Sequence, residues 1–296
     1  MLIHLIVLDV DALGSKARTI NGETMTSNFP FDPQVRNFSL VNAYALARAA
    51  KLAYRPPEHM GPALQGEWGF DDWQYFDQGS ARGFAASQAG LILLSFRGTK
   101  VDHLEDWFAD ANIQLEPGSA GRVHAGFQHA LLRGWKEIQS LLDAYRGDDH
   151  SHALWITGHS LGAALATLAT AKLLWEEQRV VQGLYLFGSP RVGDNVFATA
   201  FDRRFGAQTF RFVNNNDVVT RLPIPTRLFP YRHVGRLKYF DHHSRLYGNT
   251  SWLHRLLDRV QGRVADLGNP GAVGIKDHHM DRYESLVERS LHARMK

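Results

Sequence analysis

The residues best suited to chemistry lie in the segment Gly-His-Ser-Leu-Gly at 158–162, which places the Ser160 hydroxyl between two glycines. An apolar stretch at 153–157 precedes the segment, and a run of small, helix-forming residues begins at 161. Because a serine hydroxyl is a weak nucleophile, it must stand on a tight strand-to-helix turn within reach of a base. The pattern therefore predicts that Ser160 is the nucleophile of acyl-transfer chemistry. A chance occurrence in a loop is the alternative, which the flanking strand and helix disfavour.

A nucleophile on such a turn works with an acid and a base that follow in the chain order serine, aspartate, histidine. Asp217 fits the second place, because it comes directly after the apolar stretch 209–213 in an Asn-Asn-Asn-Asp turn. The alternative for Asp217 is an Asx-turn residue, since Asn and Asp are common in turns. The residues alone do not decide whether Asp217 is a catalytic acid or a turn residue.

Two pairs of adjacent histidines could supply the base, His242-His243 and His278-His279. Histidine titrates close to neutral pH and can both accept and return a proton. A single histidine is nevertheless more often a solvated or hydrogen-bonded structural residue than a catalyst. The chain order therefore favours a base near the end of the sequence without choosing between neighbours.

The elements that must position these residues alternate along the chain. Strands are expected at 73–76, 83–87, 91–96, 153–157, 183–187 and 209–213, with an extended segment at 231–240. Helices are expected at 38–52, 127–145, 161–175, near 197–201, at 252–267 and at 280–291. Several strands are almost entirely apolar, which indicates an α/β fold with a mainly parallel central sheet covered by helices on both faces. We expect a peripheral segment at 1–34 and a single domain at 35–296.

Further segments resemble the class 3 (fungal-type) lipase family over roughly residues 38–290 of this chain. In addition to 158–162, they are Phe96-Arg-Gly-Thr99, Asp106-Trp107 with Asp110, Val123-His-Ala-Gly-Phe127, Phe187-Gly-Ser-Pro-Arg-Val-Gly-Asp194, Val213-Asn-Asn-Asn-Asp217 and the His-x-Met-x-x-Tyr segment His278–Tyr283. Together these segments are specific for the family, whereas the serine segment alone would not separate it from other α/β-hydrolases. The resemblance implies an α/β-hydrolase fold and an esterase-type active site.

The resemblance also implies roles for individual residues. Thr99 and the backbone N–H of Leu161 would form the oxyanion hole, and one such donor is typically worth ~10²–10³ in turnover. For Thr99, an ordinary turn residue is the alternative. The family usually has Asn at the position of Asp194, so we interpret Asp194 as structural.

The resemblance places the base at His278, with His279 second and His243 third. His278 would take the proton of Ser160 and later return it to the leaving alcohol. Asp217 would fix the tautomer of the imidazole ring and stabilise its charged form.

By the same resemblance, the segment near 100–113 is a lid over the pocket. Leu104, Trp107 and Phe108 fall on one helical face, and charged residues occupy the other. Such a helix can exchange its packing on a pocket for contact with lipid. An ordinary surface helix fits the pattern equally well. A basic amphipathic stretch at 252–267 could lie on a membrane surface, although packing of its apolar stripe against the sheet is favoured.

The composition limits which other kinds of site and partner the chain can have. The 296 residues contain no cysteine, which excludes disulfides, thiolate zinc sites and a cysteine nucleophile. No metal signature, phosphate cradle or dinucleotide fingerprint is present, so no cofactor is expected. Residues 201–296 hold 17 Lys and Arg against 9 Asp and Glu, but these basic residues are scattered and do not indicate nucleic-acid binding. No apolar run approaches the ~20 residues of a membrane-spanning helix. The start of the chain reads poorly as a signal peptide, which leaves both a secreted and a cytoplasmic location open.

The sequence thus predicts a serine hydrolase of carboxylic esters, first of all a triacylglycerol lipase that forms an acyl-enzyme on Ser160. The expected partner is a lipid or small acyl ester, with possible peripheral contact to a lipid interface. A carboxylesterase or phospholipase A1 of the same fold is the alternative within this chemistry. A catalytically inactive lipid-binding relative is the alternative from another class.

Overall fold

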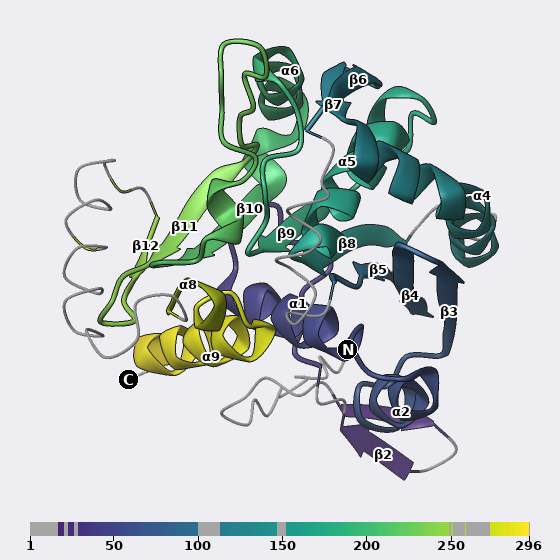
Figure 1. Ribbon diagram of the computed structural model, residues 1–296. Coiled ribbons are helices and arrows are strands. Elements are labelled where there is room, and N and C mark those ends of the chain that lie inside the picture. The colour runs from purple at the N-terminus through teal and green to yellow at the C-terminus, as the bar shows by residue number, and fades with distance from the viewer. Residues whose placement is uncertain are drawn as a thin grey trace, which may run out of the picture.

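The computed structural model describes residues 17–20, 23–26, 29–99, 113–146, 152–248, 250, 258 and 273–295. Its centre is an eight-stranded sheet with the strand order β12-β11-β10-β9-β8-β5-β4-β3 (Figure 1). The strands of this sheet are β3 (Asp72–Gln78), β4 (Ala81–Gln88), β5 (Leu91–Phe96), β8 (Ala153–His159), β9 (Gly183–Phe187), β10 (Thr209–Asn214), β11 (Arg236–Phe240) and β12 (Leu246–Tyr247). From β5 to β11 each neighbouring pair is parallel. The edges are antiparallel, with β3 and β4 on one side and β12 on the other.

One face of the sheet is covered by α4 (Ala125–Arg146), α5 (Leu161–Trp175) and α6 (Asn195–Phe205) (Figure 1). Helix α5 is buried along nearly its whole length, because its small residues let it lie directly against the strands. A Cβ atom on Gly162 would come within 2.3 Å of the Phe96 carbonyl oxygen at the end of β5. Glycine at this position therefore brings the start of α5 against β5.

The other face is covered by α1 (Leu40–Leu52) and α9 (Met280–Met295), which pack on each other. The two helices are joined by the Tyr44 hydroxyl, which donates to Glu288 Oε1 at 2.9 Å, and by an ion pair of Lys51 with Glu284 at 2.6 Å. The residues that precede α9 are thereby held against the sheet. This contact matters for the site because His278 lies two residues before the start of α9.

The segment that follows residue 28 also packs on this second core. The Phe29 side chain is buried and its ring stacks on Trp68 at a centroid distance of 4.9 Å. The indole N–H of Trp155 donates to the Pro33 carbonyl oxygen at 3.0 Å. The strands β1 (Ala17–Ile20) and β2 (Glu23–Thr26) form a separate two-stranded antiparallel sheet.

Smaller elements complete the described chain. A hairpin of β6 (Leu115–Gly118) and β7 (Gly121–His124) leads into α4. The other short elements are α2 (Pro57–Gly61), η1 (Pro62–Glu67), η3 (Gly206–Gln208), η4 (Val219–Arg221) and α8 (Val273–Lys276). Within the described ranges, no helix has the length and apolar character needed to cross a membrane.

The parallel strands bring the predicted site residues to one edge of the sheet. Thr99 follows β5, Ser160 follows β8 and Asp217 follows β10. The carboxyl ends of parallel strands lie at the same edge, where α/β folds bind their ligands. The predicted lid residues Leu104, Trp107 and Phe108, and most of the stretch 252–267, lie outside the described residues.

Candidate active site

Ser160 stands on a strained turn between β8 and α5. Its backbone has φ 58° and ψ −127°, a region that non-glycine residues seldom occupy. The Ser160 N–H donates to the Phe187 carbonyl oxygen of β9 at 3.0 Å, which fixes the turn to the sheet. A Cβ atom on Gly158 would come within 2.4 Å of the Gly162 carbonyl oxygen. The glycines on either side thus permit the tight strand-to-helix turn that presents the hydroxyl group.

Asp217 and His278 are brought together from positions 61 residues apart, with His278 Nδ1 lying 2.8 Å from Asp217 Oδ2. Both side chains are fully buried. The second carboxylate oxygen, Oδ1, accepts the Val219 N–H at 2.9 Å, so the carboxylate is held in its turn. A Cβ atom on Gly188 would meet the His278 ring and Asp217 Oδ2 at 2.9–3.0 Å. Gly188 therefore leaves the space that this hydrogen bond occupies.

Tyr283 adds a second hydrogen bond to the same carboxylate. Its hydroxyl group donates to Asp217 Oδ2 at 2.6 Å and accepts the Asn214 N–H at 3.0 Å. Burial, and then the negative charge of Asp217, raise the pKa of Tyr283 well above its ordinary value, so the hydroxyl remains a donor. The sequence contained this tyrosine in the His-x-Met-x-x-Tyr segment without indicating its contact.

The other histidines considered as the base lie elsewhere. His279 is exposed, and its carbonyl oxygen accepts the N–H of Arg282 at the start of α9. His243 is also exposed, while the ring of its neighbour His242 pairs with the buried Asp258. Among the described residues, the structure thus pairs Asp217 with His278 and not with its rivals.

Asp194 has a structural position, as its departure from the family pattern indicated. Its Oδ1 atom accepts the Phe197 N–H at 2.8 Å and thereby caps the start of α6. The same oxygen lies 3.3 Å from the Arg122 N–H of β7. Asp194 therefore connects the start of α6 to the β6–β7 hairpin.

The predicted oxyanion residues flank the nucleophile. Leu161 is the first residue of α5, where backbone N–H groups lack a helical acceptor and the helix dipole favours negative charge. Thr99 lies on the loop after β5, next to Gly98. A Cβ atom on Gly98 would come within 3.0 Å of Ser160 Cβ, so the loop runs directly beside the nucleophile. This arrangement brings two sources of N–H or O–H donors to the same end of the sheet.

Two polar atoms at this site are buried without a hydrogen-bond partner among the described residues, Ser160 Oγ and His278 Nε2. Buried polar atoms are normally paired, and a catalytic role is one of the physical reasons for an exception. In the uncharged tautomer that donates from Nδ1 to Asp217, the lone pair of Nε2 is available. That atom can therefore accept a proton from an incoming hydroxyl.

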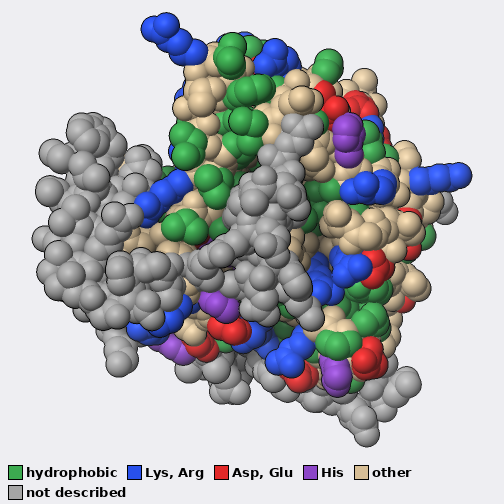
Figure 2. Space-filling view, in the orientation of Figure 1, with side chains coloured by type: hydrophobic (Ala, Val, Ile, Leu, Met, Phe, Trp, Pro, Cys, Tyr) green, Lys and Arg blue, Asp and Glu red, His purple; other side chains and the backbone are tan. Residues whose placement is uncertain are grey.

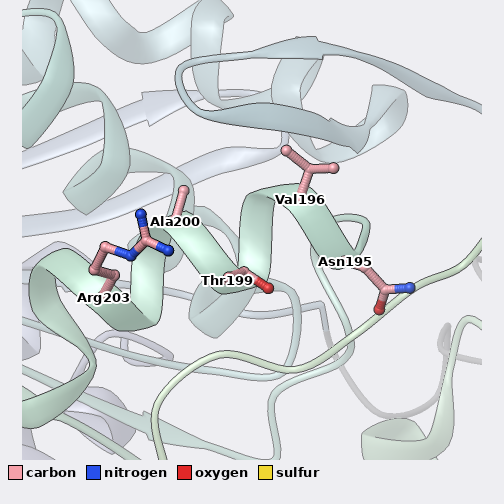
Figure 3. Close-up of a pocket in the computed structure, with 5 residues that line it drawn as sticks. All are labelled: Asn195, Val196, Thr199, Ala200 and Arg203. Atoms are coloured by element: carbon pink, nitrogen blue, oxygen red, sulfur yellow. The ribbon is translucent and has the colours of Figure 1, made fainter.

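The surface around this edge carries exposed apolar side chains. Figure 2 shows hydrophobic side chains on the face that includes α6 and the loops near it. Exposed apolar side chains of α6 and of the stretch between η4 and β11 include Val196, Ile224 and Leu228. A pocket of about 460 Å³ lies on α6 itself (Figure 3). Its lining residues are Asn195, Val196, Thr199, Ala200 and Arg203. None of them is a predicted catalytic residue, so this pocket is separate from the Asp217–His278 pair. In the described part of the chain, no group of three or more His, Asp or Glu side chains could hold a metal ion.

Known proteins resemble the chain in sequence. Residues 93–226 match the family described as lipase (class 3). Triacylglycerol lipase OBL1 of Arabidopsis thaliana is 30% identical over 65% of this chain and 48% of its own length. Phospholipase A1-II 2 of Oryza sativa subsp. indica is 28% identical over 76% of this chain and 68% of its own length. The chain spans only 48% and 39% of the OBL1 lipases of Arabidopsis thaliana and Ricinus communis.

Solved structures resemble the fold. A lipase of Rhizopus microsporus var. chinensis superposes with a TM-score of 0.54 at 27% identity, over 75% of this chain and 84% of that chain. The mono- and diacylglycerol lipase of Aspergillus oryzae superposes with a TM-score of 0.63 over 84% of this chain and 99% of that chain. Because the two sequences are only 20% identical, this similarity supports the fold and not a shared activity. The chain has the α/β-hydrolase fold, as the alternation of strands and helices and the sequence resemblance predicted.

Proposed function

Because residues 93–226 match the class 3 lipase family and the chain has the α/β-hydrolase fold, we propose that it is an enzyme of that family and hydrolyses carboxylic esters of lipids through an acyl-enzyme on Ser160. The observation that carries the proposal is the buried hydrogen bond between His278 Nδ1 and Asp217 Oδ2 at 2.8 Å. It leaves Nε2 of the same ring free at the edge of the sheet where the strained turn presents Ser160.

The first half of the reaction forms the acyl-enzyme. His278 Nε2 takes the proton of Ser160 Oγ as this oxygen attacks the ester carbonyl carbon. The negative charge that develops on the carbonyl oxygen is stabilised by the Leu161 N–H and by Thr99. When the carbon–oxygen bond to the alcohol breaks, His278 returns the proton to the leaving alcohol.

The second half releases the fatty acid. His278 removes a proton from a water molecule, whose oxygen attacks the acyl carbon. The bond to Ser160 Oγ then breaks and the serine recovers its proton from His278. Asp217 remains charged throughout and stabilises the imidazolium form of His278 in both halves.

Acylglycerols are the first substrate class to test, since the relatives include triacylglycerol lipases and mono- and diacylglycerol lipases. The exposed apolar side chains at this end of the molecule are compatible with contact at a lipid surface. Phospholipase A1 activity is a second candidate, because the rice phospholipase A1 matches 76% of this chain.

Hydrolysis of p-nitrophenyl butyrate and p-nitrophenyl palmitate by the wild type and Ser160→Ala tests the proposal. We expect the substitution to lower kcat by ~10³-fold or more, with unchanged circular dichroism. Release of fatty acid from emulsified trioctanoin and from phosphatidylcholine vesicles then distinguishes a triacylglycerol lipase from a phospholipase A1. Equal rates for the wild type and Ser160→Ala, or no hydrolysis by either, would refute the proposed function.

A further inference from the structure

His159, the residue before the nucleophile, is buried with both ring nitrogens in hydrogen bonds. Its Nδ1 atom lies 2.7 Å from the Tyr54 hydroxyl, and its Nε2 atom lies 2.7 Å from the backbone carbonyl oxygen of His278. The two imidazole rings have their centroids 4.6 Å apart. The side chain of the last residue of β8 thus reaches the backbone of the residue proposed as the base.

The direction of each hydrogen bond follows from its partners. A carbonyl oxygen can only accept, so Nε2 of His159 must carry a proton and donate it to His278. Burial, and then the neighbouring His278, lower the pKa of His159 well below its ordinary value, which keeps the ring neutral. Nδ1 of the neutral ring is consequently an acceptor, and it accepts the hydrogen bond that the Tyr54 hydroxyl donates. The Tyr54 oxygen in turn accepts the backbone N–H of Gly98.

The resulting chain of donors runs from Gly98 through Tyr54 and His159 to the His278 carbonyl oxygen. Its first member lies on the loop of Thr99 and packs tightly there, because a Cβ atom on Gly98 would be 2.2 Å from the Tyr54 hydroxyl oxygen and 2.5 Å from the His159 carbonyl oxygen. Its last member is the backbone of the proposed base. The chain therefore links the loop beside the nucleophile, the strand-to-helix turn and the segment before α9.

We propose that Tyr54 and His159 are positioning residues. Through their hydrogen bonds they hold His278 and the loop of Thr99 in the correct place relative to Ser160. This inference rests on the proposed function, since it assigns a purpose to a network around that site. Neither residue contacts substrate in the proposal; both act through His278 and the loop of Thr99. A misplacement of about 1 Å at such groups can lower a rate by ~10²-fold, so the loss of one link is expected to affect kcat.

Three substitutions remove different hydrogen bonds of this chain of donors. Tyr54→Phe keeps the ring and removes the hydroxyl group, which interrupts the chain on both sides of Tyr54. His159→Gln places an amide N–H where Nε2 was and retains the bond to the His278 carbonyl oxygen, but loses the acceptor for Tyr54. His159→Asn retains an acceptor for Tyr54 and loses the bond to His278.

With p-nitrophenyl butyrate as substrate, we expect the substitutions to affect kcat and to leave KM nearly unchanged. Tyr54→Phe and His159→Asn should lower kcat by ~10-fold or more with KM within twofold of the wild type. His159→Gln should retain several-fold more activity than His159→Asn, because it keeps the bond to the base. Full kcat in Tyr54→Phe and His159→Asn, or equal losses in the two His159 variants, would overturn the inference.

Tyr185→Phe is the matched control, since this tyrosine is also buried in the second core and its hydroxyl joins β9 to Ser39, the residue before α1. That hydroxyl accepts the Ser39 N–H at 3.1 Å and lies outside the chain described above. Tyr185→Phe should lower the free energy of unfolding without a change in kcat. A loss of kcat in this control as large as in Tyr54→Phe would show that the effect of Tyr54 is general destabilisation, and would contradict a positioning role.

A readout independent of activity separates this inference from the proposed function. In ¹⁵N NMR spectra of histidine-labelled protein at pH 7, His159 should show a protonated Nε2 and an unprotonated Nδ1, with the resonance identified by its absence in His159→Gln. Tyr54→Phe should change the Nδ1 shift of His159. The opposite tautomer, or no response to Tyr54→Phe, would overturn the hydrogen-bond chain even if the wild type showed no esterase activity.

Discussion

Asp217 accepts hydrogen bonds from two side chains at the same oxygen, His278 at 2.8 Å and Tyr283 at 2.6 Å. A carboxylate that is held by two donors has little freedom to rotate away from the imidazole ring. Tyr283→Phe removes one of these donors and leaves the Asn214 N–H without its acceptor. We expect a decrease in kcat of ~10-fold, because the orientation of His278 depends on Asp217, measured with p-nitrophenyl butyrate.

Tyr239→Phe is the control for this substitution. The Tyr239 hydroxyl also donates to a buried carboxylate, Asp258 Oδ2 at 2.7 Å, which is not the partner of His278. Its loss should leave kcat within twofold of the wild type. Equal effects of the two substitutions would contradict a specific role of Tyr283 at Asp217.

At the residue scale, the sequence indicated the proposed nucleophile, acid and base but not the residues that support them. Chain order and the family resemblance together pointed to Ser160, Asp217 and His278. Tyr54 and His159 could not be paired in this way, because their contact depends on where α1 ends relative to β8. Hydrogen bonds between residues distant in the chain exist only once the strands are in register.

At the element scale, Asp194 fixes the start of α6 and its attachment to β7. Asp194→Ala removes the acceptor of the Phe197 N–H, which should lower the free energy of unfolding by ~1–2 kcal/mol. Urea denaturation measures this value, and Asp194→Asn should restore most of it because asparagine also caps helices. The control is Asp143→Ala on α4, where the exposed ion pair with Arg179 should contribute less than about 1 kcal/mol. A loss in Asp194→Ala no larger than in this control would refute the capping role.

The long apolar elements were predicted closely and the short ones were missed. The bounds of β5, α5 and β9 coincide with the expected ranges, because continuous burial leaves an unbroken apolar run. The hairpin of β6 and β7 was not predicted, since each strand has only four residues and Pro117 lies within the first. The extended segment at 231–240 contains regular strand only from Arg236, while its first part is held by single contacts such as Tyr231 Oη to the Ile113 carbonyl oxygen.

At the scale of the whole molecule, buried histidines make folding sensitive to acid. His124 is 1% exposed, and burial lowers its pKa from 6.5 to about 4. Between these values the unfolded chain binds a proton that the folded protein does not, so stability falls as the pH decreases from about 6.5 to 4. The shift corresponds to a loss of ~3 kcal/mol for this residue. His159, whose pKa is also lowered by burial, acts in the same direction.

His124→Asn tests this contribution, because Asn can still accept the Phe127 N–H but does not titrate. The free energy of unfolding, measured in urea at pH 7, 5.5 and 4, should fall less steeply for the variant than for the wild type. Parallel dependences on pH in the two proteins would contradict a buried, neutral His124.

The general architecture followed from sequence, whereas the order of the strands did not. Alternating helices and apolar strands predict a mainly parallel sheet, and the eight-stranded sheet has this form. Pairing of β5 with β8 and the antiparallel edge of β3 and β4 depend on which faces the helices cover. No local pattern encodes this, because it results from the packing of α1 and α9 on one side and α4 and α5 on the other.

The central claim, that Ser160 is a nucleophile activated by His278 and Asp217, is tested most directly by covalent labelling. The wild type is treated with a p-nitrophenyl alkylphosphonate, and the modified peptide is identified by mass spectrometry. We predict a single phosphonylated residue, Ser160, with labelling ~10²-fold slower or more in His278→Ala and almost unchanged in His279→Ala. Labelling at another residue, or equal rates in the wild type and His278→Ala, would contradict the account.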